Sequence, residues 1–343
     1  MKKASKLLAI TFLLLPGKYM SAQSSDSYKV RPVQITFAYP LGSNGINSMK
    51  YVNNFSLNIL YGLNGGVTGA EIGSIINFNR GDAKGLQISG VSNINSGNMN
   101  GIQLSGVLNI TRGETEGIQL AGVANFNTNA TKGFQLGTAN FTKSDFTGFQ
   151  LGVINFSGSL AGMQFGVINV LGNPDGALPI GIFSIVKNGH YELEVTGGEV
   201  LYLNLNYKMG VDKFYTIFKA GLSYYNQEPV YSVGLGFGGM VKLGGTGTLS
   251  IDASGNEIVY KNDWSSEQEN LLNKLDLNYR YGITQNLSIL AGPSFNLYLT
   301  QKIFDNKYGT LNLPYHIFTN ESSDARTKSY FWIGANAGLS FKF

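Results

Sequence analysis

The stretch GIQLSGVLNI, residues 101–110, recurs in recognisable form several times along the first half of the chain. Each copy begins with a Gly, carries a Gln or Glu two residues later, and closes with an Asn. Self-similarity at a fixed period is typical of repeat architectures. The period runs 16, 16, 16, 16, 15 and 14 residues between Gly69, Gly85, Gly101, Gly117, Gly133, Gly148 and Gly162.

Amide side chains occupy two constant positions of this repeat. In a β-solenoid each coil lies parallel on the previous one, so that identical residues stack and hydrogen-bond along the stack, as in cross-β ladders. Antiparallel neighbours would not align identical residues. We therefore expect one ladder of Gln and one of Asn, formed by Gln87, Gln103, Gln119, Gln135, Gln150 and Gln164, and by Asn77, Asn93, Asn109, Asn125, Asn140, Asn155 and Asn169.

The distance from Gly to Asn within a unit indicates a bend. It is eight residues in the first four units and seven in the last three. Loss of one residue inside a continuous strand would turn every later side chain to the other face. We expect two short strands per unit, joined at the second Gly (Gly106, Gly122, Gly152, Gly166), because Gly tolerates unusual φ and ψ values.

An alternative interpretation treats each unit as one membrane-crossing strand. In residues 101–110, Ile102, Leu104 and Leu108 face one way, while Gln103 and Asn109 face the other, which also suits a barrel wall. If every unit crossed the membrane, the chain would form a single barrel of about 16–18 strands with a water-filled lumen. Passive transport would then be the favoured function.

The C-terminal part, residues 199–343, alternates apolar and polar residues in repeated runs. Its last run, YFWIGANAGLSFKF (330–343), is typical of a transmembrane barrel strand. Short links near 211–212, 244–247 and 284–286 alternate with longer ones at 226–230, 261–271 and 301–328, as in outer-membrane barrels. The chain ends on Phe343, which resembles the terminal signal read by the barrel assembly machinery.

The seven runs of this part need at least one more strand, because a barrel has to close. Residues 29–42, with Val33 and Ile35 alternating against Gln34 and Thr36, are predicted as the first barrel strand. The repeat region 52–171 would then be an insertion on the outer face, followed by connecting strands at 172–198. Because 52–63 and 190–198 supply a further pair, we expect an all-β fold with about 8–10 barrel strands.

Residues 1–23 have the three parts of a secretory signal peptide: a basic start, an apolar run over 7–15, and small residues near Ser21 and Ala22. Removing Lys2, Lys3, Lys6 and Lys18 from the 25 basic residues leaves 21, against 21 acidic ones. A neutral mature chain gives no reason to expect a nucleic-acid partner.

Residues that carry chemistry are scarce. The chain has no Cys and only two histidines, His190 and His316, both expected at the surface, so the usual zinc or copper ligands are missing. No nucleophile motif of a hydrolase is present. We expect no enzyme, no cofactor and no metal. On the polar face of the C-terminal strands, Lys274, Asp276, Arg280 and Lys342 are expected to pair inside the barrel.

The copies GLQISGVSNI, GIQLSGVLNI and GIQLAGVANF, with the preceding NNFSLNILYGLNGGVTGAEIG, carry a resemblance to a known family. The repeat region resembles the leptospiral-type surface-repeat proteins, which are also frequent in Bacteroidota. The resemblance implies a bacterial surface or outer-membrane location and transfers no catalytic or binding residues.

The expected function is therefore that of a non-enzymatic outer-membrane surface protein. Its barrel would anchor a Gly/Gln/Asn repeat module displayed for adhesion or envelope interaction. The expected partners are outer-membrane lipid, the assembly machinery and an unidentified extracellular ligand. The loop 301–328, with Tyr308, Tyr315 and Phe318, is the best candidate for a contact surface outside the repeats.

Overall fold

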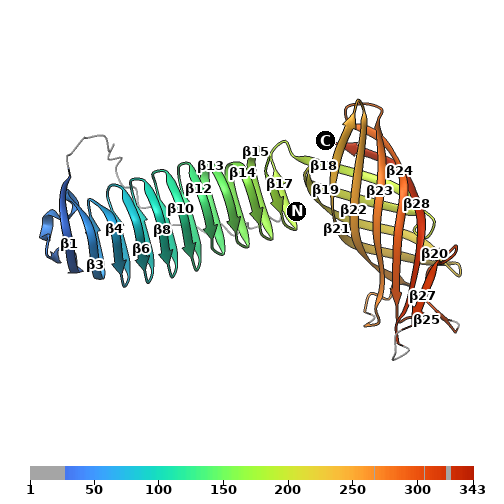
Figure 1. Cartoon of the computed structure of the whole chain (residues 1–343). Coiled ribbons are helices and arrows are strands. Elements are labelled where there is room, and N and C mark those ends of the chain that lie inside the picture. Colours follow the sequence, from blue (N-terminus) through green and yellow to red (C-terminus); the bar gives the residue numbers. More distant parts are fainter. Residues whose placement is uncertain (1–27, 266, 305, 322–325) are drawn as a thin grey trace, which may run out of the picture.

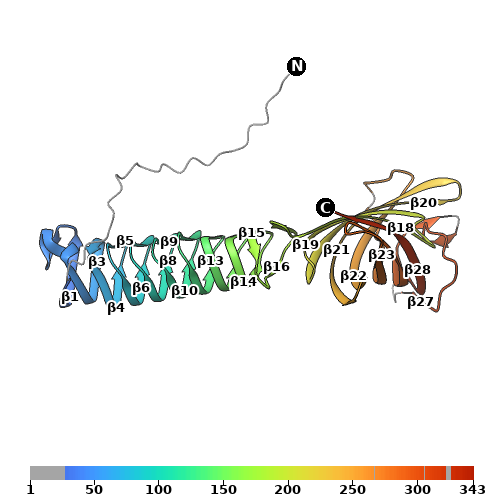
Figure 2. The same ribbon diagram turned by 90° about the horizontal axis from the view of Figure 1, so that it is seen from above.

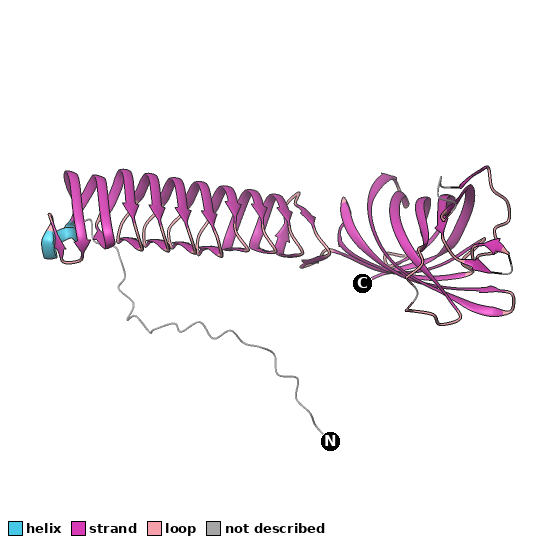
Figure 3. Cartoon of the chain, turned by 90° about the horizontal axis from the view of Figure 1, so that it is seen from below, coloured by secondary structure: helices cyan, strands magenta, loops and turns pink. Residues whose placement is uncertain are grey.

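The computed structural model describes residues 28–343 except 266, 305 and 322–325, so the expected signal peptide lies outside the described residues. Two all-β bodies follow one another along the chain: a parallel β-solenoid of about eight turns and a closed antiparallel barrel of eight strands (Figure 1). Among the described residues, the one helix drawn in Figure 3 is the short 3-10 helix Gly45–Lys50 at the start of the solenoid. No helix in this part of the chain has the length and apolar character needed to cross a membrane.

The solenoid is built as the repeat predicts, from two short strands per coil. Apart from a two-residue antiparallel strand at its N-terminal end, each strand pairs in parallel with its counterpart in the next coil. Its strands are β1 (Lys29–Ala38), β2 (Leu41–Gly42), β3 (Tyr51–Asn64), β4 (Gly66–Gly73), β5 (Ile76–Asn79), β6 (Ala83–Ser89), β7 (Ser92–Asn95), β8 (Met99–Ser105), β9 (Leu108–Thr111), β10 (Thr115–Ala121), β11 (Ala124–Asn127), β12 (Thr131–Leu136), β13 (Ala139–Leu151), β14 (Ile154–Phe165), β15 (Ile168–Pro174), β16 (Leu178–Ile180) and β17 (Phe183–Val186).

The coils stack in register, so that the same residue type occupies the same position in neighbouring coils. Gln119 lies beside Gln103 on one side and Gln135 on the other. The loss of one residue per coil falls in the corner between the two strands, and the pairing continues unshifted on both sides of it. The single barrel of 16–18 strands is therefore wrong, because its neighbouring strands would be antiparallel.

Both Gly positions of the repeat leave no room for a Cβ, and the first also has a positive φ. Gly117 has a φ of 137°, and a Cβ there would lie 1.9 Å from the carbonyl oxygen of Gly101. Gly106 and Gly122, where the sequence led us to expect an unusual backbone, have no positive φ, but a Cβ there would lie 2.1–2.2 Å from the carbonyl oxygen of the Gly one coil earlier. Close stacking of successive backbones, together with the positive φ, explains why this Gly recurs in every coil.

Residues 29–42 do not form a barrel strand. β1 pairs in parallel with β3, with Val33 beside Phe55, and so forms the first coil of the solenoid. Solenoid and barrel strands both place apolar residues outward and polar residues inward, so alternation alone did not distinguish them. The solenoid also extends beyond 171 to Val186, and of the expected connecting strands only 190–198 belongs to the barrel. The solenoid therefore precedes the barrel and is not inserted into it.

The barrel is formed by the C-terminal part of the chain alone. Each strand pairs antiparallel with the next, and the first strand pairs with the last to close the wall. The eight strands are β18 (His190–Gly198), β19 (Leu203–Val211), β20 (Phe214–Tyr225), β21 (Glu228–Gly244), β22 (Gly247–Tyr260), β23 (Asn270–Gly282), β24 (Leu287–Thr300) and β28 (Lys328–Lys342), with the short strands β25 (Ile303–Phe304), β26 (Lys307–Tyr308) and β27 (Phe318–Glu321) between the last two.

The two ends of the barrel differ. Turns at 212–213, 245–246 and 283–286 form the end that we call the short-turn end. The opposite, long-loop end carries the segments 261–269 and 301–327, together with two tighter connections. One of these was expected to be long: Asn226 and Gln227 have φ values of 49° and 64° and make a two-residue hairpin turn instead.

The chain enters the barrel at the short-turn end and finishes there. His190, the first residue of β18, pairs with Gly210 at the end of β19, and Phe343 follows the last residue of β28. The last solenoid coil packs on the outer wall of the barrel close by, where Thr216 donates a hydrogen bond of 2.7 Å to the carbonyl of Gly181. From this contact the solenoid extends sideways, across the general direction of the barrel strands (Figures 1 and 2).

Candidate functional site

The interior of the solenoid contains the amide side chains that the repeat singles out. All six of the expected Gln residues are buried, and each from Gln103 onward donates from Nε2 to the Oε1 of the Gln one coil earlier. The hydrogen bonds form an unbroken ladder that donates toward the N-terminus. The distances are 2.9 Å (Gln103 to Gln87), 2.6 Å (Gln119 to Gln103), 2.8 Å (Gln135 to Gln119), 2.7 Å (Gln150 to Gln135) and 2.6 Å (Gln164 to Gln150).

The Asn ladder has the opposite polarity. Asn109 donates from Nδ2 to Asn125 Oδ1 at 2.9 Å and accepts from Asn93 at 3.0 Å, so the donors point toward the C-terminus. The same Nδ2 group donates to the backbone carbonyl of Leu120 in the corner of the next coil, at 2.9 Å. Each Asn therefore links two coils by its side chain and also satisfies a corner carbonyl. The same pattern holds for Asn77, Asn93, Asn125, Asn140 and Asn155, while Asn169 donates to the carbonyl of Ile180.

A carboxylate terminates the Gln ladder. Glu71 occupies the Gln position of its coil, is fully buried, and accepts hydrogen bonds from the amides of Gln87, Asn58, Asn64 and Asn79 at 2.6–3.0 Å. Burial raises the pKa of Glu71 above its ordinary value, and the four amide donors oppose this effect. All the amide donors of the Gln ladder point toward this group. The carboxylate of Glu71 therefore accepts the last hydrogen bond at the N-terminal end of the ladder.

Inside the barrel, paired charges fill the half nearer the short-turn end. Lys208 lies 2.7 Å from both Glu194 and Asp252. Arg280 contacts Glu194 at 3.1 Å and also pairs with Glu192. All five side chains are buried. Because each charge meets an opposite charge within hydrogen-bond distance, the cluster is an ion-pair network closed on itself.

A second cluster lies farther along the lumen. Asp276 lies 3.4 Å from Lys219 and 3.6 Å from Lys274, and it accepts a hydrogen bond from Ser294. The sequence placed Lys274, Asp276 and Arg280 in the lumen, and the structure brings them together with partners there. Lys342 lies instead at the short-turn end, where it pairs with Asp212 at 3.2 Å.

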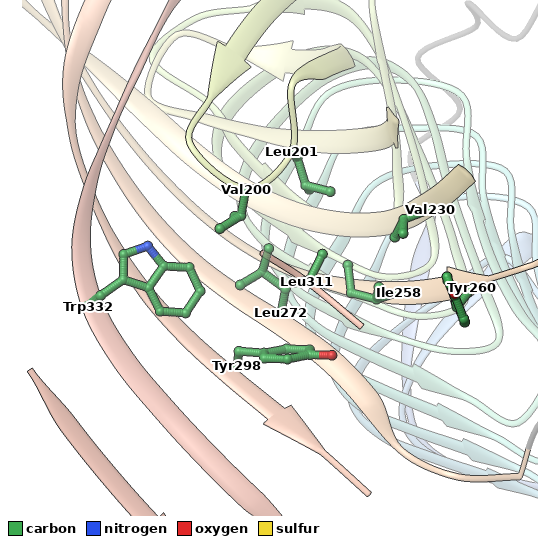
Figure 4. Close-up of a cluster of buried hydrophobic side chains, with 9 residues drawn as sticks. All are labelled: Val200, Leu201, Val230, Ile258, Tyr260, Leu272, Tyr298, Leu311 and Trp332. Carbon is green, nitrogen blue, oxygen red and sulfur yellow. The ribbon is translucent and has the colours of Figure 1, made fainter. Parts of the chain in front are cut away.

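Apolar side chains occupy the lumen at the long-loop end (Figure 4). Leu311 belongs to the loop 301–327 and not to a wall strand, yet it packs in the same cluster. The neighbouring Thr310 donates its backbone N–H to Tyr298 Oη at 2.9 Å. The part of the loop around Thr310 and Leu311 therefore folds back over the mouth, while Tyr315 and Phe318 stay exposed. The cluster, which we call the apolar plug, comprises Val200, Leu201, Val230, Ile258, Tyr260, Leu272, Tyr298, Leu311 and Trp332.

The two histidines lie at opposite ends of the barrel. His190 was expected at the surface, but it is buried, stacks on Tyr215, and its Nδ1 lies 2.9 Å from Asp212. The hydrogen bond from His190, with help from Lys342, holds the pKa of Asp212 well below its usual range. His316 is exposed and lies edge-on to Tyr330. In the described part of the chain, no three His, Cys, Asp or Glu side chains are grouped to hold a metal ion.

The acidic partners Glu192, Glu194 and Asp252 were missed by sequence reasoning. Alternation in 190–198 does place Glu192 and Glu194 opposite Leu193 and Val195, which was a usable signal. Asp252 lies within β22, and the sequence analysis gave it no role.

Phe343 is exposed at the short-turn end, stacks on Tyr207, and donates its backbone N–H to the carbonyl of Tyr191.

Comparison of the chain with protein-family models, with curated proteins and with solved structures gives no match.

Proposed function

We propose that this protein is a non-enzymatic outer-membrane protein whose barrel anchors a rigid amide-ladder solenoid for interaction within the bacterial envelope. The observation that carries the proposal is the barrel wall, which is apolar outside and charged inside. Outward residues such as Leu205, Leu235, Ile251 and Ile289 are 38–46% exposed, while the inward network around Lys208 is buried. This distribution is typical of a transmembrane barrel and would expose a large apolar surface to water in a soluble protein.

The filled lumen favours an anchor over a porin. Eight-stranded barrels are just wide enough for their own side chains to fill. Here the ion pairs around Lys208 and Asp276 occupy one half and the apolar plug the other. The alternative of a passive porin required the repeats to be barrel strands, and they form a solenoid instead. We expect no stepwise conductance from the purified protein in a planar bilayer.

The lengths of the loops at the two ends of the barrel support one side of the outer membrane for the solenoid. Bacterial outer-membrane barrels keep their short turns in the periplasm and their longer loops outside. The solenoid joins at the short-turn end, beside His190 and the turn at 212–213. This orientation supports a periplasmic solenoid, and so favours envelope interaction over adhesion. Display outside the cell rested on residues 29–42 as a barrel strand, which they are not.

The absence of native Cys allows a direct test of sidedness. Single cysteines replace Glu114, in an exposed solenoid link, and Thr319, in the long-loop end. Cells are treated with a membrane-impermeant maleimide before and after permeabilisation of the outer membrane. We expect T319C to react in intact cells and E114C only after permeabilisation. The reverse pattern would restore surface display, and recovery of both variants in the soluble fraction would exclude the membrane barrel.

A further inference from the structure

The solenoid is polar inside and apolar outside. Rows of large apolar side chains cover both strand faces and the corner between them, each 37–53% exposed. The corner row, which we call the apolar corner, comprises Ile75, Val91, Val107, Val123, Val153, Val167 and Ile182; the faces carry Ile72, Ile102, Ile118, Phe126, Leu136, Ile154, Met163, Phe165, Phe183 and Ile185. An exposed apolar surface of this extent marks a protein or membrane interaction site.

Charge is confined to the opposite corner. Within residues 66–186, all of which the structure describes, Glu71 is the one charged residue inside the solenoid. Every other charge lies in the links from one coil to the next, at the second residue of the strand that follows, or, for Lys143 and Asp145, where β13 runs without a break through this corner. This charged corner comprises Arg80, Asp82, Lys84, Arg112, Glu114, Glu116, Lys132, Lys143, Asp145 and Asp175. The solenoid is thus amphipathic across its section along its whole length.

The docking of the last coil orients these two corners relative to the barrel. Residues 174–177, in the charged corner, lie beside Val211, Asp212 and Lys213 at the short-turn end. The apolar corner of the same coil lies farther along the wall. There Gly181, next to Ile182, accepts a hydrogen bond from Thr216, and Phe183 on the adjoining face stacks on the outward-facing Phe218. At a rise of about 3.3 Å per residue, Phe218 lies about 13 Å along β20 from its start, or about 10 Å in depth for a strand tilted by about 40°.

This depth is that of a single leaflet, because half of a hydrocarbon core measures about 15 Å. The apolar surface of the solenoid is continuous with the apolar barrel wall through Phe183 and Phe218, and its charges lie level with the short turns. Successive coils stack away from the contact side by side (Figure 1), so the same orientation continues along the solenoid.

The backbone also suits contact with acyl chains, in which an unpaired polar group is costly. In the apolar corner, the N–H groups of Gly106, Val107 and Leu108 donate to carbonyls of the preceding coil at 3.0–3.2 Å. Corner carbonyls such as that of Leu120 accept from the Asn ladder inside. Both strands of each coil pair with their neighbours on either side. The corner therefore presents apolar side chains to the outside. Its backbone N–H and C=O groups are hydrogen-bonded within the solenoid.

We propose that the solenoid lies in the lipid leaflet on the short-turn side of the membrane, with its apolar corner among the acyl chains and its charged corner in water. The inference rests on the proposed membrane barrel. The partner of the solenoid is then the phospholipid leaflet itself. Its coils, about eight in number, would lie embedded along this leaflet beside the barrel.

The test uses single cysteines in the full-length protein, labelled with an environment-sensitive fluorophore and reconstituted into phosphatidylcholine–phosphatidylglycerol vesicles. V107C reports the apolar corner, E114C the charged corner of the same coil, and L275C the outer wall of the barrel. Quenching by brominated acyl chains is compared with quenching by iodide. We expect brominated lipid to quench V107C and L275C severalfold more than E114C, and iodide to show the reverse order.

The outcomes separate the two proposals. If L275C is not quenched by brominated lipid, the membrane barrel itself fails. If L275C is quenched while iodide quenches V107C as strongly as E114C, the barrel stands and the lipid-embedded solenoid is overturned. If V107C is shielded from both quenchers, a second copy or another protein covers the corner, which also overturns the inference. V91C serves as a second apolar-corner position, in case one substitution disturbs the fold.

Discussion

The ring of Phe183, in the last coil of the solenoid, stacks on the ring of Phe218 on the outer wall of the barrel, with centroids 5.6 Å apart. Together with the hydrogen bond from Thr216 to Gly181, this contact fixes the direction in which the solenoid leaves the barrel. The linker between the two bodies is only 187–189, so the stack is a principal restraint on their orientation.

Replacing Phe183 by Ala should loosen this restraint without unfolding either body. A stacked aromatic pair contributes about 1 kcal/mol beyond its buried area. We expect trypsin to cleave at the exposed Lys187 severalfold faster in F183A than in the wild type, measured in detergent by mass spectrometry. The matched control is F126A, which removes a similar stack on Phe141 in mid-solenoid. Equal cleavage of F183A and F126A would contradict a restraining role for the contact.

Breaking one rung of the Asn ladder should destabilise the coils on both sides of it. In N109L, the amide of Asn93 loses one of its two acceptors, and Asn125 Oδ1 and the carbonyl of Leu120 lose their donor. Stranded buried polar groups of this kind cost about 1–3 kcal/mol each. We expect faster amide hydrogen exchange across residues 92–127 and no change in the barrel. Exchange at the rate of the control N100A, which alters an exposed Asn one strand earlier, would show that the ladder is dispensable.

The two amide ladders are the feature that the sequence alone predicted most completely. Gln103 and Gln119 stand at the same place in a fixed period, and identity at fixed spacing in a parallel stack means contact. The position of β1 was not accessible in this way, because Val33 and Ile35 alternate with Gln34 and Thr36 as barrel residues do. What separates the two bodies is the direction of pairing, which a single strand does not encode.

The ion-pair network was also beyond the sequence. Arg280 and Glu192 are 88 residues apart and meet only because β18 pairs with β28 and closes the wall. Lys274 and Asp276 lie on one strand, so their common face could be predicted from alternation.

The stability of the solenoid should depend on pH through Glu71. Because its pKa is raised in the folded protein, folding favours the protonated form. This contribution is fully present below the unfolded pKa of about 4.3 and is lost as the pH rises through the folded value. We expect the melting temperature of E71Q, minus that of the wild type, to increase from pH 4 to pH 8 in detergent.

The comparison of E71Q with the wild type isolates this one group. The amide that replaces the carboxylate changes the hydrogen bonds from Asn58, Asn64, Asn79 and Gln87, but that offset does not vary with pH. The control E116Q removes an exposed carboxylate and should give a difference that is flat with pH. A flat or falling difference for E71Q would mean that the folded protein keeps this carboxylate charged.

Lys208 should be essential to the barrel because it neutralises two buried acids. In K208A, Glu194 keeps Arg280 and Asp252 keeps the hydroxyl of Tyr215, but each loses a cation that lies 2.7 Å away. Removing one partner of a buried ion pair typically costs about 3–5 kcal/mol. We expect the temperature at which the folded band is lost in unheated gel electrophoresis to fall by many degrees.

Two further variants separate charge from packing in this experiment. K208M retains most of the side-chain volume and should destabilise the barrel nearly as much as K208A, because the missing charge dominates. K242A removes a lysine that is 82% exposed at the short-turn end and should leave the transition unchanged. If K208M instead melts with the wild type, the lysine acts by filling the lumen, and the network around it contributes little to holding the barrel closed.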